Sequence, residues 1–152
     1  MSTDNEHYMS QAIDLAKLAF ANDEVPVGAV IVERKSNTVI AKSSNKMREK
    51  KNAMYHAEIL SIQQACNHLQ NERLVGCDIY VSLEPCPMCA GAAINARISH
   101  LIFGAHDPKA GATETLYNLL ADPRLNHQAR ITSGVLADDC GAILSKFFAD
   151  KR

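Results

Sequence analysis

The sequence of 152 residues has neither a long apolar run nor an excess of charge of one sign. No stretch approaches the roughly 20 apolar residues that a membrane-spanning helix needs, and the first residues do not resemble a signal peptide. The formal net charge of −1 gives no overall electrostatic attraction to nucleic acid. We therefore expect no membrane partner, and any contact with a polyanion must depend on local charge.

The chain also lacks an even number of cysteines, because it has five. Its hydrophobic share of 47% is sufficient for a core at this length, so the fold needs no disulfide. Cys66, Cys77 and Cys140 lie singly in apolar segments, which is typical of buried free thiols. This use of cysteine predicts a reducing compartment, and we expect a cytoplasmic protein.

No linker, repeat or low-complexity segment divides the chain, which predicts a single domain over residues 1–152. Thr3, Asp4, Asn5 and Glu6 have the form of a capping box at the start of a helix. The apolar patterns predict helices over residues 4–21, 56–69, 87–96, 116–120 and 138–149, and strands over residues 27–32, 38–41, 78–83, 101–104 and 131–135. Residues 45–52 are expected to form a loop. Strands that alternate with helices indicate an α/β fold whose sheet is covered on both faces.

Four residues in two short motifs carry the chemistry. His56 and Glu58 belong to a His-Ala-Glu triplet, and Cys86 and Cys89 belong to Pro-Cys-Pro-Met-Cys, thirty positions later. One imidazole and two thiolates suit a zinc ion, and three protein ligands leave a tetrahedral position open for water, as in catalytic zinc sites. Glu58 is too close to His56 in sequence to serve as a further ligand, and it is placed to move protons beside the metal.

Neither motif is specific to one chemistry when it stands alone. A Cys-x-x-Cys pair is as common in structural zinc sites and in redox pairs. Together, and in this order, the two motifs match the signature of the zinc nucleobase deaminases. Both motifs also fall at expected helix N-termini, where the partial positive charge of the helix end favours a thiolate.

Almost the whole chain resembles the bacterial tRNA-specific adenosine deaminases of the cytidine-deaminase-like superfamily. The matching stretches are EVPVGAV (24–30), HAEI (56–59), YVSLEPCPMCAGA (80–92), FGAHDPKAG (103–111), NH (126–127), GVL (134–136) and FF (147–148). The metal motifs are common to the superfamily. The Gly-Ala-x-Asp-x-Lys-x-Gly stretch, the Asn-His pair and the double Phe point to the tRNA branch.

The resemblance implies a three-layer α/β/α sandwich with a five-stranded mixed sheet, and a homodimer whose partner helps to line the RNA cleft. It also implies one Zn²⁺ per chain on His56, Cys86 and Cys89. In the implied reaction, a metal-bound hydroxide attacks C6 of adenosine, Glu58 shuttles the protons, and inosine is formed at the wobble position of a tRNA anticodon.

The resemblance further assigns substrate contacts to Asn45, Asp107 and Lys109. Asn45 would hold the target nucleoside, Asp107 would accept a hydrogen bond from a 2′-OH, and Lys109 would contact phosphate. Without the resemblance, Asn45 and the Asp107-Pro108 pair are ordinary turn residues.

Two features beside these motifs are less typical of the family. Asn52, Ala53 and Met54 stand where relatives have Asp-Pro-Thr, and Tyr55 replaces a small residue directly before His56. The shape of this loop is therefore not implied by the resemblance. The segment before it carries four basic residues, Lys46, Arg48, Lys50 and Lys51, which form either a solvated loop or a local RNA contact.

Three functions remain open at this point. The first is deamination of a tRNA anticodon, and the second is deamination of a free base or nucleoside such as guanine or cytosine. The third is a zinc protein that binds RNA or has a structural role without catalysis. Glu58 argues against the third, because a structural metal site has no use for this carboxylate.

Overall fold

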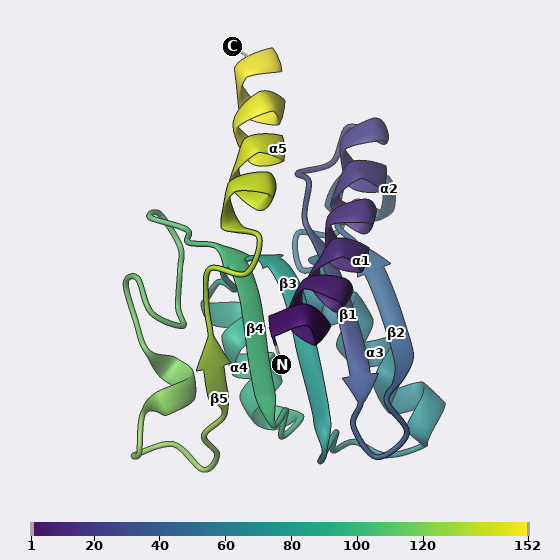
Figure 1. The fold of residues 1–152 in the computed structure, drawn as a ribbon, viewed down its shortest axis with the longest axis vertical. Helices are drawn as coiled ribbons and strands as arrows, with labels where there is room; N and C mark the ends of the chain where they lie inside the picture. Colours follow the sequence, from purple (N-terminus) through teal and green to yellow (C-terminus); the bar gives the residue numbers. More distant parts are fainter. Residues whose placement is uncertain (1, 152) are drawn as a thin grey trace.

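The structure is a computed structural model that describes the backbone of residues 2–151 and the side chains of residues 4–151. Five strands form one mixed sheet in the order β2-β1-β3-β4-β5 (Figure 1). Their bounds are β1 (Gly28–Glu33), β2 (Thr38–Ser44), β3 (Cys77–Leu83), β4 (His100–Ala105) and β5 (Arg130–Thr132). β1 is antiparallel to β2 and β3, while β3, β4 and β5 are parallel. The capping role expected of the Thr3 side chain lies outside the described residues.

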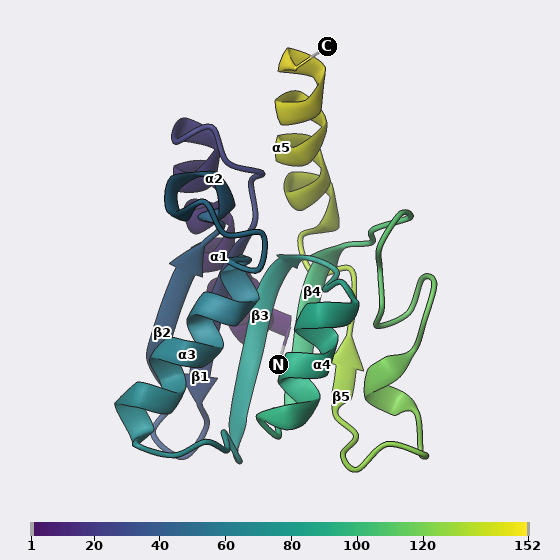
Figure 2. The same cartoon turned by 180° about the vertical axis from the view of Figure 1, so that it is seen from behind.

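Helices cover both faces of the sheet. α1 (Ser2–Ala21) and α5 (Ala137–Asp150) lie on one face, and α3 (Ala57–Leu69) and α4 (Pro87–Asn95) lie on the other (Figures 1 and 2). Alternate residues of each strand point to opposite faces, so Val30 and Tyr80 pack beneath α1 while Ile31 and Ile79 pack beneath α3 and α4. The expected three-layer α/β/α sandwich with a five-stranded mixed sheet is confirmed.

Gly28 at the start of β1 allows α1 to pack closely against the sheet. A Cβ atom at this position would lie 2.0 Å from the carbonyl oxygen of Ala12 and 2.6 Å from Cβ of Leu15. Any larger residue would therefore push α1 away from the sheet.

Two expected segments differ from the structure. The loop expected over residues 45–52 contains a helical turn, α2 (Met47–Lys50). The helix expected over residues 116–120 is wrong, since only a 3₁₀ turn forms at Leu119–Ala121. The amides of Leu116 and Tyr117 instead donate to the carbonyl of Gly111, which closes the preceding loop on itself. The last strand is also shorter than expected and ends at Thr132.

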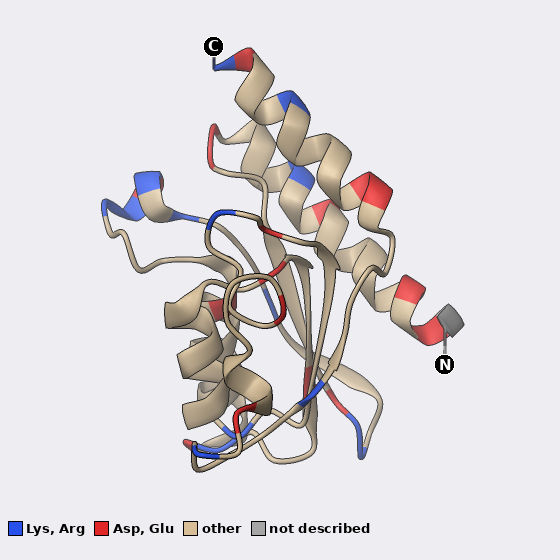
Figure 3. Cartoon of the chain, turned by 90° about the vertical axis from the view of Figure 1, so that its left-hand side faces the viewer, with Lys and Arg blue, Asp and Glu red and all other residues tan. Residues whose placement is uncertain are grey.

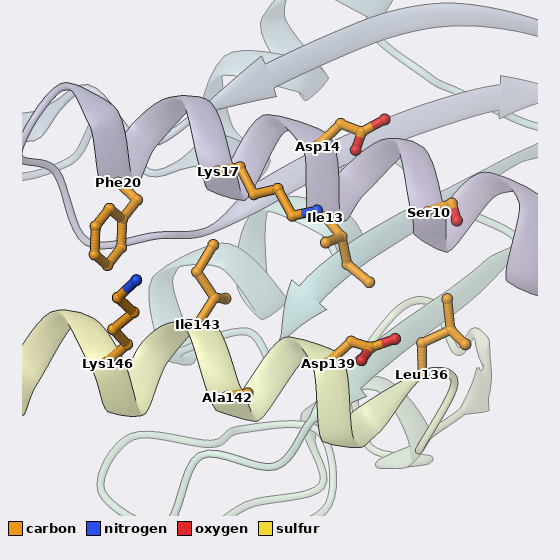
Figure 4. A pocket seen from close by; sticks show the side chains of 10 residues that line it. All are labelled: Ser10, Ile13, Asp14, Lys17, Phe20, Leu136, Asp139, Ala142, Ile143 and Lys146. Atoms are coloured by element: carbon orange, nitrogen blue, oxygen red, sulfur yellow. The ribbon is translucent and has the colours of Figure 1, made fainter.

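The two helices on the α1 face enclose a groove of about 560 Å³ (Figure 4). Phe20 and Lys17 of α1 face Ile143 and Lys146 of α5 across it, and the Lys146 ammonium lies 5.7 Å from the centre of the Phe20 ring. This groove lies across the sheet from α3 and α4, where the predicted metal ligands lie. No described helix combines the length and hydropathy required to cross a membrane.

The predicted functional residues gather at one edge of the sheet. β2, β3 and β4 end at this edge, and β1 begins there. α3 and α4 start beside it, on the face opposite α1 (Figure 2). Segments that are far apart in sequence, from residue 25 to residue 110, therefore meet in one place.

Candidate active site

Two helix N-termini bring the predicted metal ligands together. His56 directly precedes α3 and Cys86 directly precedes α4, and both residues have an extended backbone (ψ 154° and 174°). Pro87 then opens α4, where its fixed φ suits a helix start and its missing N–H leaves no helical hydrogen bond unmade. Cys89 lies in the first turn of the same helix and is buried.

The donor atoms of these three residues lie close to one another. Nδ1 of His56 is 3.6 Å from Sγ of Cys86 and 3.5 Å from Sγ of Cys89. One ligand atom from each residue lies within 4.8 Å of the others. The trio can therefore hold a single metal ion between an imidazole and two sulfur atoms.

The two thiols do not ionise equally. A hydrogen bond from the Cys89 thiol, opposed by burial and helped by His56, lowers the pKa of Cys86 to about 4. The same hydrogen bond, together with burial and the nearby Glu58, raises the pKa of Cys89. The hydrogen bond with Cys86 also raises the pKa of His56. The protein's own groups thus stabilise one thiolate, and a second thiolate requires a cation beside it.

Glu58 lies in the first turn of α3 and is 5% exposed. Burial raises the pKa of its carboxyl group to about 7, although its own backbone N–H and the neighbouring His56 oppose the shift. A carboxyl group with such a pKa can both accept and release a proton near neutral pH. The carboxyl group of Glu58 also interacts with Cys86 and Cys89, so it lies beside the two sulfur atoms.

A pocket of about 180 Å³ opens next to these residues. Its walls combine apolar side chains, including Val25, Val27 and Leu83, with Asn45 and Asp107. Val25, Leu83 and Asp107 also line a wider cleft of about 1040 Å³, so the two cavities share part of their walls. Phe148 of α5 lines this outer cleft and is 46% exposed, whereas its neighbour Phe147 is buried against Phe20.

Two of the three predicted substrate residues line the inner pocket. Asn45 is 4% exposed, and its Oδ1 accepts the N–H of Met47 at 3.1 Å, so its amide N–H₂ group remains the part that can donate to a ligand. Asp107 uses Oδ1 to accept the N–H groups of Lys109 and Ala110, at 2.9 and 3.2 Å. Lys109 is exposed and lines only the outer cleft.

A sequence-family model described as MafB19-like deaminase matches residues 3–152. The tRNA-specific adenosine deaminase of Bacillus subtilis is 47% identical over 150 residues, which is 99% of this chain and 92% of that protein. The enzyme of the same name from Rickettsia bellii is 44% identical over 140 residues, or 92% of this chain and 97% of its own length. This chain belongs to the tRNA-specific adenosine deaminase family.

Solved structures give the same result for the fold of this deaminase. One, from a study of A-to-I editing by tRNA:A34 deaminases at the wobble position, superposes with a TM-score of 0.86 at 44% identity, and covers 91% of this chain and 99% of that one. A guanine deaminase from Nitrosomonas europaea superposes with a TM-score of 0.83 at 27% identity, and covers 95% of this chain and 84% of that one. The family resemblance inferred from the motifs is confirmed.

Two buried carboxylates of this deaminase carry no role in the sequence-based expectations. Glu24 and Glu84 are each 2% exposed and lie at the same edge of the sheet as the pocket. Burial would raise the pKa of Glu84, but hydrogen bonds from the Thr115 side chain and from the backbone N–H groups of Asp107, Glu114 and Thr115 hold that pKa at about 2. The sequence feature that both share is an acidic residue one or two positions before a proline.

Proposed function

We propose that this chain is a zinc-dependent hydrolase that converts adenosine to inosine at the wobble position of a tRNA anticodon. In this proposal residues 1–152 form a single deaminase domain. The observation that carries it is the convergence of His56, Cys86 and Cys89 beside the buried Glu58, in a chain that belongs to the tRNA-specific adenosine deaminase family.

Zinc is the metal that we propose for the trio. A tetrahedral arrangement with a Zn–S bond of about 2.3 Å and a Zn–N bond of about 2.0 Å places nitrogen and sulfur about 3.5 Å apart. The distances from His56 Nδ1 to the two sulfur atoms, 3.6 and 3.5 Å, fit this geometry. The chemistry that zinc supplies when bound is the acidification of a water molecule, from a pKa of about 15.7 to about 7.

Glu58 is the residue that we propose to move protons in this reaction. Its carboxylate can accept a proton from the attacking water and deliver it to the ring nitrogen next to C6. It can then accept the proton of the new C6 hydroxyl and deliver it to the amine, which leaves as ammonia while the C6 carbonyl forms. A single group can perform these steps because the transfers are short and the pocket is shielded from bulk water. Asn45 would orient the nucleoside by donating from its side-chain amide.

The two adjoining cavities support a nucleotide that is part of RNA. A base turned out of a loop can enter the inner pocket, while its neighbours occupy the outer cleft beside Lys109 and Phe148. Asp107 lines both cavities, and its Oδ2 is the oxygen that can accept a hydrogen bond from a ribose 2′-OH. An anticodon loop suits this arrangement because its bases are already unpaired.

A local basic surface supports binding of a polyanion by a chain with a net charge of −1. Lys46, Arg48, Lys50 and Lys51 gather on and around the α2 turn, directly after Asn45 (Figure 3). Arg48 pairs with Asp23 at 2.5 Å, and Lys50 lies 3.4 Å from Glu49. Lys50 and Lys51 are exposed, so their charges are available to phosphate groups.

We also propose a homodimer that acts in the cytoplasm, where its tRNA substrate is found. Exposed apolar side chains support a partner, since Met54, Leu116 and Tyr117 are each more than half exposed. A second copy of the chain would remove such side chains from water.

The alternative is deamination of a free purine base. The structural similarity to a guanine deaminase favours it, because the same fold and a similar arrangement of strands and helices serve a free base in that protein. The outer cleft argues for the RNA substrate, since a free base would not fill it.

Comparing substrates tests the proposal. Purified protein is incubated with an anticodon stem-loop that carries adenosine at the wobble position, and separately with guanine, adenosine and cytidine, and the products are separated by chromatography. We expect inosine in the stem-loop and little reaction of the free compounds. A stem-loop with guanosine at the wobble position and a Glu58→Ala variant serve as controls. Efficient deamination of guanine without any reaction of the stem-loop would establish the alternative.

A further inference from the structure

The carboxylate of Glu84 accepts several hydrogen bonds from the loop that carries Asp107. Its Oε1 accepts hydrogen bonds from the N–H of Asp107 at 3.0 Å and the hydroxyl of Thr115 at 2.5 Å. Its Oε2 accepts the N–H groups of Thr113, Glu114 and Thr115, at 3.2, 2.8 and 2.9 Å, and the hydroxyl of Thr113 at 3.2 Å. One carboxylate therefore binds both ends of residues 107–115, a segment without helix or strand.

Gly111 gives this carboxylate the space it occupies. A Cβ atom on Gly111 would lie 2.3 Å from Oε1 of Glu84 and 2.6 Å from the carbonyl oxygen of Asp107. The close approach of Gly111 and the ring of donors show that the loop wraps around the carboxylate from several sides. A chance contact would not involve four backbone amides of one loop.

Glu24 plays the corresponding part on the other side of the pocket. Its Oε1 accepts the N–H of Arg48 at 3.0 Å, and its Oε2 accepts the N–H of Glu49 at 2.8 Å. These amides belong to α2, and they have no partner within so short a helix. Glu24 thus fixes the turn that directly follows Asn45 and bears the basic side chains.

We propose that Glu24 and Glu84 are positioning residues. Each holds one substrate-binding loop in a fixed place at the entrance of the pocket, with Asn45 on the first loop and Asp107 on the second. This inference rests on the proposed function, and it assigns to each loop one buried carboxylate that binds its backbone. Neither glutamate touches the target base in this role. Each acts through the backbone of the loop that it binds.

The arrangement of the hydrogen bonds supports positioning over general stabilisation. Every hydrogen bond that the structure gives the two carboxylates comes from a loop that lines the pocket or carries a substrate residue. Hydrogen bonds to a charged acceptor are stronger than those between neutral groups, so they can fix a loop that lacks regular structure. Fixing matters because a loop that is already ordered loses less conformational entropy when substrate binds, which favours a low KM.

Matched Glu→Gln variants test the proposal. Glu84→Gln is compared with Glu114→Gln, whose side chain pairs with His106 at the surface, and Glu24→Gln with Glu49→Gln, whose side chain lies near Lys50. All four variants remove one negative charge, so a general change in attraction to RNA is the same in each pair. Zinc content and the KM and kcat for the anticodon stem-loop are measured for all.

We expect Glu24→Gln and Glu84→Gln to raise KM about 10-fold or more while kcat changes by less than about 3-fold, with zinc retained. A variant that is merely less stable would lose active protein and hence kcat, and its KM would stay the same. Hydrogen exchange without substrate should increase over residues 107–115 in Glu84→Gln only, and over residues 47–51 in Glu24→Gln only. The control variants should match the wild type in both measurements.

Unchanged KM and unchanged exchange in folded, zinc-loaded Glu24→Gln and Glu84→Gln would overturn the proposal. Should Glu84→Gln fail to fold, Thr115→Val replaces it, because this change removes only one hydroxyl donor from Oε1. Failure of the proposed function gives a different result, in which the wild-type protein leaves the stem-loop unchanged. In that case KM is measured with whichever compound the protein deaminates, and the exchange pattern of the two loops still decides whether each glutamate holds its own loop.

Discussion

β3 brings ionisable side chains together at both of its ends. At its start, the Asp78 carboxylate is 4% exposed and accepts a hydrogen bond from Nε of Arg34 at 2.5 Å. The same guanidinium group hydrogen-bonds the hydroxyl of Tyr80, which in turn donates to Asn5 at 3.1 Å. Arg34 also lies 5.6 and 5.7 Å from the ring centres of Tyr8 and Tyr80. The protein thus supplies its own cation at this end.

At the other end of β3, no described residue that lines the pocket supplies such a cation. Cys86 follows the strand by three residues and meets His56, Cys89 and Glu58. Among the described residues that line the adjacent pocket, none is lysine or arginine. Two thiols and a carboxylic acid therefore share a buried place in which only the imidazole can carry a positive charge.

The two ends of β3 differ in whether their buried charges are paired within the chain, and this difference separates a structural site from a functional one. A buried charge is costly unless it is paired, so a site that lacks the partner within the chain must receive it from outside. At the start of β3 the pairing is complete, and the site can stabilise the fold alone. At its end the pairing is incomplete, which is what a metal site requires. Four changes test this difference.

Removal of the metal ligands should have the largest effect. We expect Cys86→Ala and Cys89→Ala to lose nearly all bound zinc and all activity, because each leaves only two ligands. Cys77→Ala changes a buried cysteine at the opposite end of the same strand and should keep about one zinc per chain, as the wild type does. Metal analysis of the purified variants measures this. Full zinc content in both ligand variants would mean that a different cysteine, such as Cys66 or Cys140, binds the metal.

Loss of the proton carrier should affect the rate without affecting the metal. Glu58→Ala removes no ligand, so zinc and fold should be retained, while turnover of the stem-loop should fall by about 10²–10⁴-fold. Single-turnover kinetics with zinc-loaded protein measure the chemical step. If the variant turned over at a rate near that of the wild type, Glu58 would have no part in proton transfer.

The opposite end of β3 should show the reverse pattern. Arg34→Leu leaves the Asp78 carboxylate buried without its cation, and the free energy of unfolding should fall by about 2 kcal/mol, since Arg34 is partly exposed. Zinc content and turnover should not change. Denaturant unfolding measures the loss, and the double variant Arg34→Leu/Asp78→Leu should recover most of it, because it removes the unpaired charge as well. A loss of zinc in Arg34→Leu would show that the two ends of the strand are coupled.

The sequence predicts that His56, Cys86 and Cys89 come together, because each lies in a short motif at a helix start, and the structure brings their donor atoms within 4.8 Å of one another. It also predicts five strands and their positions, since their apolar runs are continuous. The two errors, the helical turn at Met47–Lys50 and the missing helix over residues 116–120, have a common physical cause. In the first segment the buried Glu24 binds amides of the turn itself, and in the second the buried Glu84 binds the amides of Glu114 and Thr115, directly before residues 116–120.

Hydrogen bonds between a backbone amide and a side chain that is distant in sequence cannot be predicted from the local pattern of apolar residues. Leu116, Leu119 and Leu120 have helical spacing, yet the amides just before them bind Glu84, thirty positions earlier in sequence. The burial of Cys66 is a smaller miss of the same kind, because this thiol is only partly buried, whereas Cys77 and Cys140 are buried as expected. Neither the partner of a backbone amide nor the depth of a single side chain can be inferred from nearby residues alone.

The smallest effect should come from charge on the surface around each end of β3. Lys50 and Lys51 lie at the end that carries the pocket, whereas Lys35 lies in the turn between β1 and β2, at the opposite end (Figure 1). Replacement of Lys50 and Lys51 by Ala should weaken stem-loop binding about 10-fold near physiological salt. It should also lower the slope of log affinity against log salt by about 1.4, because two contacts to single-stranded phosphate are lost.

Lys35→Ala loses one positive charge of the same type and should change neither quantity. Titrations by fluorescence anisotropy at several salt concentrations measure both. An equal loss per lysine at the two ends would mean that RNA is attracted by overall charge, and that the basic turn beside Asn45 has no special part in binding.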